Sequence, residues 1–129
     1  MRTSETLLLC ELVMLTGIAL HHVAHAQTTC QTSNASPSAY DCVNAAAYIT
    51  SLGSGTRCCQ ENCRGSLCTT MHTSGSCKVG ICGACGQCLP CDVAGTDLSN
   101  VVSSCQSNGK VGGFFIDDNN NHLQFIVFS

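Results

Sequence analysis

Two stretches of the chain repeat apolar residues at helical spacing, and each predicts an amphipathic helix. In residues 36–53, Ser36 is a good N-cap, Pro37 suits the first helical position, and Gly53 supplies a C-terminal stop. The apolar stripe of this predicted helix consists of Cys42, Ala45 or Ala46, Ile49 and Leu52.

The second predicted helix covers residues 96–109, with Thr96 as its cap and Asn108-Gly109 at its end. Asp97 falls in the first turn, where the helix dipole favours a negative charge. The apolar stripe consists of Leu98, Val101, Val102 and Cys105. Because each stripe includes a cysteine, we expect both helices to be cross-linked to the elements that they cover.

Strand patterns occupy much of the remaining chain. Residues 75–83 alternate between bounding glycines, and a further short strand is expected within 56–60. Residues 110–117 and 122–129 flank a cluster of turn-forming residues and predict a C-terminal hairpin. Residues 27–35 are polar and are expected to form a loosely held arm. The hairpin is expected to supply Phe114, Ile116, Phe125 and Val127, or their neighbours, to a core.

The predicted order of elements is therefore helix, strand, strand, helix, hairpin. Antiparallel strands covered by two helices satisfy this order. The predicted fold class is α+β: a small disulfide-rich sandwich, with an antiparallel sheet and two helices packed on one face.

The first 26 residues have the three parts of a secretory signal peptide. Arg2 provides a positive start, Leu7 to Leu20 is mostly apolar, and Ala24-His25-Ala26 fits a cleavage site. Glu11 interrupts the apolar run, which lacks the roughly 18 uninterrupted apolar residues of a membrane anchor. We expect a signal peptide over residues 1–26, a single secreted extracellular domain over residues 27–129, and no membrane anchor.

The cysteine count supports the same division. The chain has 13 cysteines, and removal of 26 residues from 129 takes away Cys10 alone, leaving 12 cysteines in 103 residues. This density exceeds the roughly 8–10% of a disulfide scaffold, and an even set in a short secreted domain predicts six disulfides. The expected disulfide cysteines are Cys30, Cys42, Cys58, Cys59, Cys63, Cys68, Cys77, Cys82, Cys85, Cys88, Cys91 and Cys105.

The segment ICGACGQCLPCD, residues 81–92, spaces four cysteines three residues apart and allows three interpretations. A metal site disagrees with the longer gaps of ferredoxin and zinc motifs. A CxxC redox site needs a thiol of lowered pKa, whereas the neighbouring Asp92 would raise it. The favoured interpretation is a loop with little core of its own, whose cysteines bond to the surrounding elements. Adjacent Cys58 and Cys59 are expected to reach two different partners.

Charge and motif content exclude several partner classes. Beyond residue 26 there are four basic and six acidic residues, with no basic run to follow a phosphate backbone, so no nucleic-acid partner is expected. No cofactor and no metal are expected, and the domain is expected to be a monomer. The cations Arg57, Arg64 and Lys78 are candidate binding residues, and solvated surface charge is the alternative for each.

No catalytic constellation is apparent in the sequence. His72 and His122 are the only histidines beyond residue 26, and neither lies in a motif with a nucleophile or a second ligand. The acidic residues are mostly placed at caps or turns. Residues 117–121 lack the spacing and the closing Glu of a calcium loop. The protein is therefore expected not to be an enzyme.

Four short motifs resemble the small secreted necrosis-inducing effector family of plant-infecting fungi. They are SPSAYDC opening a helix, GSC entering a strand, AGTDLSNVV opening a second helix, and GKVGG before the last strands. CRGSLC, residues 63–68, is similar to a signature of the viral killer toxins of smut fungi. That resemblance implies an α/β sandwich of antiparallel strands with two helices.

The leading hypothesis is a secreted, non-enzymatic, effector- or toxin-like binding protein of fungal origin, directed at an unidentified host or competitor cell-surface target. One alternative is a surface-active or wall-associated coat protein, which would expose the apolar GGFF and LQFIVF segments. A further alternative is a CxxC thiol oxidoreductase.

Overall fold

A five-stranded antiparallel sheet lies at the centre of the molecule. The computed structural model describes residues 27–129, so the predicted signal peptide lies outside the described residues. The strand order is β1-β6-β7-β4-β3, and β2 and β5 form a separate two-stranded sheet. The strands are β1 (Gln27–Cys30), β2 (Arg57–Cys59), β3 (Cys68–Ser74), β4 (Cys77–Cys82), β5 (Cys88–Pro90), β6 (Gly113–Asp117) and β7 (Leu123–Phe128).

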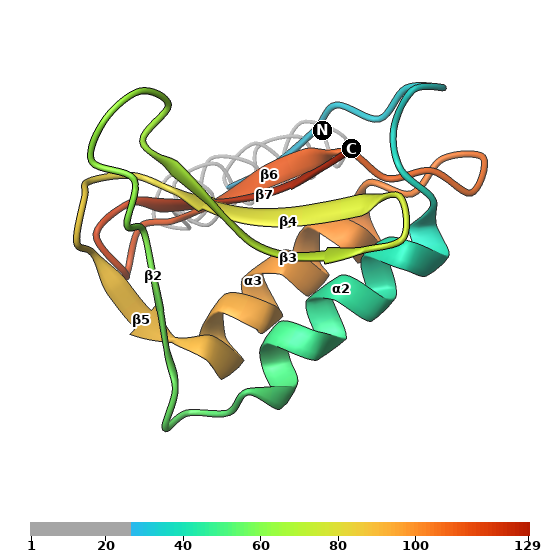
Figure 1. Cartoon of the computed structure of the whole chain (residues 1–129). Coiled ribbons are helices and arrows are strands. Elements are labelled where there is room, and N and C mark those ends of the chain that lie inside the picture. Colours follow the sequence, from blue (N-terminus) through green and yellow to red (C-terminus); the bar gives the residue numbers. More distant parts are fainter. Residues whose placement is uncertain (1–26) are drawn as a thin grey trace, which may run out of the picture.

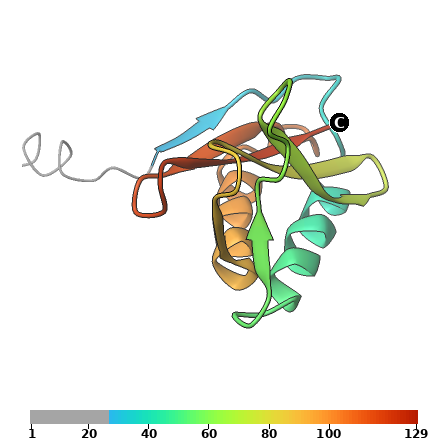
Figure 2. The same cartoon turned by 60° about the vertical axis from the view of Figure 1, so that its left-hand side comes forward.

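Two helices, α2 (Ala39–Ser51) and α3 (Cys91–Ser104), pack on one face of this sheet. They run side by side beneath it, as Figures 1 and 2 show. This arrangement confirms the predicted α+β class. The core lies between the helices and the inner face of the sheet, and its apolar members include Ile49, Val79, Ile81, Leu98, Val101, Leu123, Phe125 and Val127.

The predicted C-terminal hairpin is confirmed, and in β6 the neighbouring residue Phe115 faces the core in place of Phe114 and Ile116. Phe115 pairs with Phe125 and is buried, at 7% exposure. Phe114 and Ile116 therefore point to the opposite face of the sheet, because successive side chains of a strand alternate.

Both helices begin elsewhere than predicted. α2 starts at Ala39 with Ser38 at the N-cap position, and the Ser36 hydroxyl instead accepts a hydrogen bond from the Ser33 amide at 2.9 Å. α3 starts at Cys91, directly after Pro90, whose φ of −59° suits a helix entry. Thr96 is thus inside α3, where its hydroxyl donates to the Asp92 carbonyl at 3.0 Å.

Three strand segments were missed. Residues 27–30 form an edge strand rather than a loose arm. Their backbone pairs with β6 at every position, from Gln27 opposite Ile116 to Cys30 opposite Gly113. β3 pairs with β4 and contains an irregularity between Thr70 and His72. β5 forms within the cysteine run and pairs with β2, the short strand that was predicted.

Candidate functional site

The four cysteines of the 81–92 run bond, in reverse order, to the four cysteines of residues 58–68. We call these two segments and their bonds the disulfide ladder. Its bonds are Cys58–Cys91, Cys59–Cys88, Cys63–Cys85 and Cys68–Cys82. Adjacent Cys58 and Cys59 reach two different partners, as predicted. The remaining bonds join α2 to β4 (Cys42–Cys77) and β1 to the end of α3 (Cys30–Cys105).

The ladder decides what the cysteine run can do chemically. None of its three CxxC units is closed on itself, and every sulfur of the run is already bonded. No thiolate of the run is therefore free for a metal or for disulfide exchange in this form. The segment is more ordered than the predicted loop, since Leu89 and Cys91 are fully buried members of the core.

Gln60 organises the space between the two sides of the ladder. Its side chain is fully buried. Its Nε2 donates to the carbonyls of Asn62 (2.8 Å) and Gly83 (3.1 Å). Its Oε1 accepts from the Asn62 amide (2.6 Å) and the Thr69 hydroxyl (2.8 Å). All four hydrogen-bonding positions of this amide are thus occupied.

The structure does not bring the three predicted binding cations together. Arg57 lies on β2 and donates to the Cys88 carbonyl at 3.3 Å. Arg64 is exposed in the loop that leads into β3 at Cys68. Lys78 lies at the opposite end of the β3–β4 pair, where it faces Thr73. These side chains do not form one charged patch.

An open, uncharged groove of about 270 Å³ lies between the outer surfaces of the two helices. It is lined by Val43, Ala46 and Ala47 of α2 and by Ser99, Val102 and Ser103 of α3. Tyr40, one turn before Val43, is 76% exposed. The sequence of α2 indicates an uncharged outer surface of this kind, because all its residues except Asp41 and Asn44 are apolar or bear a hydroxyl group.

The face of the sheet away from the helices carries a second apolar surface. Phe114 pairs with Ile126 across β6 and β7, and both are half-buried. Ile116 and Phe128 share this face by alternation. We call these four residues the outer sheet patch.

Two buried carboxyl groups meet where α3 passes the β6–β7 turn. Asp97 is 6% exposed and Asp117 is 8% exposed. The Oδ2 atom of Asp97 is buried without a donor to pair with. Asp117 accepts from the Asn119 amide at 3.1 Å and from the Asn120 side chain at 3.0 Å.

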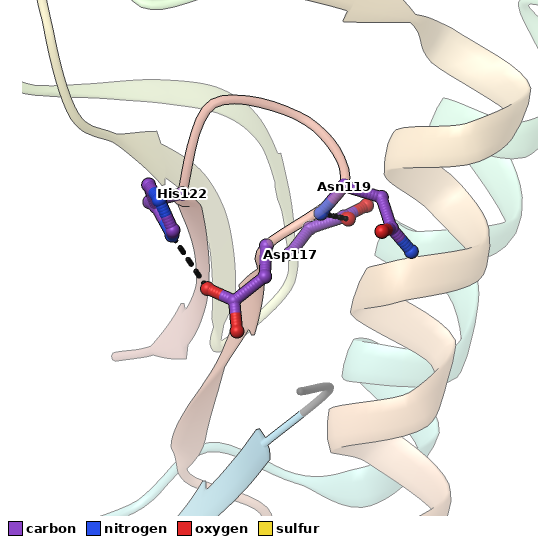
Figure 3. Close-up of polar contacts among 4 residues, drawn as sticks. Asp117, Asn119 and His122 are labelled. Carbon is purple, nitrogen blue, oxygen red and sulfur yellow. Dashed lines mark hydrogen bonds and ion pairs between the residues drawn. The ribbon is translucent and has the colours of Figure 1, made fainter. Parts of the chain in front are cut away.

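The two sides of this turn are chemically different. Figure 3 shows Asp117 and Asn119 on the side that faces α3. On the other side His122 pairs with Asp118 at 2.6 Å. His122 is exposed in this turn, whereas His72 is on β3 and stacks on Tyr48 with ring centroids 3.8 Å apart.

The surroundings of the two carboxyls shift their pKa values in opposite directions. Burial raises the pKa of Asp97 to about 8, and the hydrogen bond to Asp117 and its negative charge act in the same direction. Burial also acts to raise the pKa of Asp117, but hydrogen bonds from Asp97, Asn120 and Asn119 outweigh it and lower this pKa below its usual 3.8. Near neutral pH the pair therefore holds one proton, with Asp97 as the donor.

This pair was not predicted, because Asp97 falls in the first turn of the helix that was predicted from residue 96. With α3 beginning at Cys91, Asp97 lies one turn after Ala94 and one turn before Val101, on the buried stripe. An earlier helix start would have revealed this position.

Residues 27–129 hold no group of three or more His, Cys, Asp or Glu side chains arranged to bind a metal. Among these residues no helix has the length and apolar character needed to cross a membrane. No protein-family model and no curated protein sequence matches this chain.

Proposed function

We propose that the protein is a secreted, non-enzymatic binding protein of the effector or toxin type, which presents a rigid surface to a host or competitor cell target. The observation that carries this proposal is the set of six disulfides, which cross-links both helices and five of the seven strands directly or at an adjoining residue. Bonds of this kind persist in oxidising compartments, so they fit an extracellular protein.

The resemblance to the necrosis-inducing effectors and to the smut-fungus killer toxins belongs to this proposal. Two helices on one face of an antiparallel sheet is the arrangement that the toxin resemblance implied. The role carried over is attack on a neighbouring cell by binding, without a catalytic step.

We propose the groove between α2 and α3 as the contact surface. Its floor is apolar and its rim bears hydroxyl groups, as in the central part of many protein interfaces, where charged residues are depleted. We propose that the occupant is a protein exposed on the target cell. Arg57, Arg64 and Lys78 lie on other parts of the surface and would contribute to encounter rather than to one shared contact.

The test is to apply the purified, fully oxidised protein to plant and fungal cells and to measure cell death or growth arrest. Ala47→Arg places a long charged side chain in the groove at an exposed helical position, so we expect it to abolish the effect while the fold survives. Asn100→Arg adds the same charge on the exposed face of α3 outside the groove residues and should retain activity. If the unmodified protein has no effect on either cell type at any practical dose, the effector or toxin role is wrong.

A second candidate is a surface-active coat protein, and the outer sheet patch favours it. Only half of the apolar C-terminal residues serve this role, since Phe115, Leu123, Phe125 and Val127 are in the core. Phe114→Ser with Ile126→Thr should then abolish foaming and film formation at an air–water interface. Equal surface activity of this variant and the unmodified protein would reject the candidate.

A further inference from the structure

The turn between β6 and β7 is fastened to the rest of the molecule on two sides. Towards α3, Asp117 faces Asp97 and also holds Asn119 and Asn120 in the turn. Towards the disulfide ladder, the Asn121 side chain donates to Gln87 Oε1 at 2.7 Å. The fastening towards α3 consists of two carboxyl groups, which can pair only while one of them is protonated.

We propose that the Asp97–Asp117 pair is a pH-sensitive latch that holds the β6–β7 turn, residues 117–122, on α3 while the pair keeps its shared proton and releases the turn when that proton is lost to solvent. Loss of the proton removes the only donor between the two groups and leaves two negative charges in contact at a buried position. Such a pair is unfavourable because each charge is poorly solvated and repels the other.

The elements packed against α3 supply no cation to relieve this repulsion. On α3 itself the other charged residue is Asp92, whose carboxylate accepts from the Val93 amide. The only charged residue of α2 is Asp41, whose carboxylate accepts hydrogen bonds from the amide and the hydroxyl of Ser76. The side chains of β1, β5 and β7 carry no charge, and Arg57 of β2 donates to the Cys88 carbonyl. Asp117 is the one charge among the described residues that shifts the pKa of Asp97.

The direction of the pH effect follows from these protonation states. Folding raises the pKa of Asp97 from 3.8 to about 8, so between these values the folded protein binds more protons than the unfolded chain. The stabilising contribution of the Asp97 proton is therefore complete below about pH 4 and is lost as the pH rises through about 8. The contribution of Asp117, whose pKa is lowered, has the opposite sign: it is present above 3.8 and is lost as the pH falls through the lowered pKa. Release of the turn is expected in that upper part of the range.

The primary measurement is a carbon-13 NMR titration of the aspartate carboxyls in the oxidised, unmodified protein. We expect the Asp97 resonance to titrate with a midpoint near 8, and the amide signals of Asn119, Asn120 and Asn121 to shift or broaden with the same midpoint. A midpoint near 4 for Asp97, or turn amides that do not respond with it, would overturn the latch.

Asp97→Asn supplies an amide donor that needs no proton, so the turn should stay closed through pH 9 and the fall in melting temperature between pH 5 and 9 should disappear. Asp118→Asn, on the outer side of the same turn, should retain the fall. The latch is wrong if Asp97→Asn and the unmodified protein show the same pH dependence. If Asp97→Asn does not fold, the titration of the unmodified protein decides by itself.

Discussion

Gln60 stabilises a part of the molecule that has little apolar core of its own. Around it, residues 60–67 and 83–87 are mostly exposed or half-buried, so packing contributes little there. The Gln60 amide links Asn62, Thr69 and Gly83 by four hydrogen bonds. A buried amide with every position satisfied stabilises one arrangement of these loops over others.

Gln60→Ala should therefore be strongly destabilising, because it removes four hydrogen bonds and leaves several partners unpaired. We expect a loss of about 2–4 kcal/mol in the free energy of unfolding. Urea unfolding with all disulfides intact measures it. Gln31→Ala is the matched control: Gln31 is exposed and its backbone bond to Gly112 survives the change, so its effect should stay within about 0.5 kcal/mol. Similar values for the two variants would contradict this role of Gln60.

The most constrained contact between elements is the crossing of α2 and α3. Gly95 of α3 lies directly against Thr50 of α2, and a Cβ atom added at Gly95 would lie 2.6 Å from the Thr50 amide nitrogen. Backbone atoms at this distance cannot yield as a flexible side chain would. The helices thus approach as closely as they do because residue 95 has no side chain.

Gly95→Ala should destabilise the protein although Ala is the better helix former. Helix propensity favours Ala by about 1 kcal/mol, but forcing the two backbones apart costs typically about 1–3 kcal/mol or more. We expect a net loss and a lower melting temperature. Asn100→Ala, at an exposed position of the same helix, should leave stability equal or slightly higher. A Gly95→Ala variant as stable as the unmodified protein would show that the helices can separate without cost.

At the level of elements, the sequence predicted the two helices, β2, β4 and the final hairpin. It failed at the starts of both helices. The Ser36 and Thr96 caps are plausible locally, but Ser36 closes a turn with Ser33, and the chain is already helical at Thr96 because α3 is fixed at Cys91 by Cys58. β1 was missed because a polar edge strand has little pattern of its own and is defined by its pairing with β6.

Over the whole molecule, the disulfides differ in how deeply they lie. Cys42 and Cys77 are fully buried between α2 and β4, whereas Cys63 and Cys85 are exposed at the outer part of the ladder. The two bonds span 35 and 22 residues, a difference worth only about 0.4 kcal/mol of chain entropy. We therefore expect the two bonds to contribute differently to the free energy of unfolding because of their burial, and not because of their loop length.

Replacing both members of each bond by serine tests this difference. Cys63→Ser with Cys85→Ser should leave a folded protein that is about 2–3 kcal/mol less stable. Cys42→Ser with Cys77→Ser buries two hydroxyl groups in the core and should lose more than about 4 kcal/mol, or fail to accumulate as folded protein. Denaturant unfolding and peptide mapping of the remaining disulfides measure both. Equal losses of stability in the two double variants would show that burial does not determine how much each bond contributes.

The candidate site was only partly predictable at this scale. The number of disulfides and the divergence of Cys58 and Cys59 follow from the sequence. Arg57, Arg64 and Lys78 were predicted to bind because they are positively charged. Charge alone does not reveal that Lys78 and Arg64 lie towards opposite ends of the β3–β4 pair. The groove and the Asp97–Asp117 pair both arise from surfaces brought together by segments distant in the chain, which no local pattern records.

The sequence by itself determined what depends on neighbours in the chain: the periodicity of the helices and strands, the paired number of cysteines, and the α+β class that they support. Only the tertiary structure decided the reverse pairing of the ladder, because twelve cysteines are chemically equivalent until the fold selects which sulfurs approach. It also decided the fate of Asp97. A carboxyl keeps its ordinary pKa in water. The packing of α3 against β6 buries this carboxyl beside Asp117, and no cation among residues 27–129 shifts its pKa back.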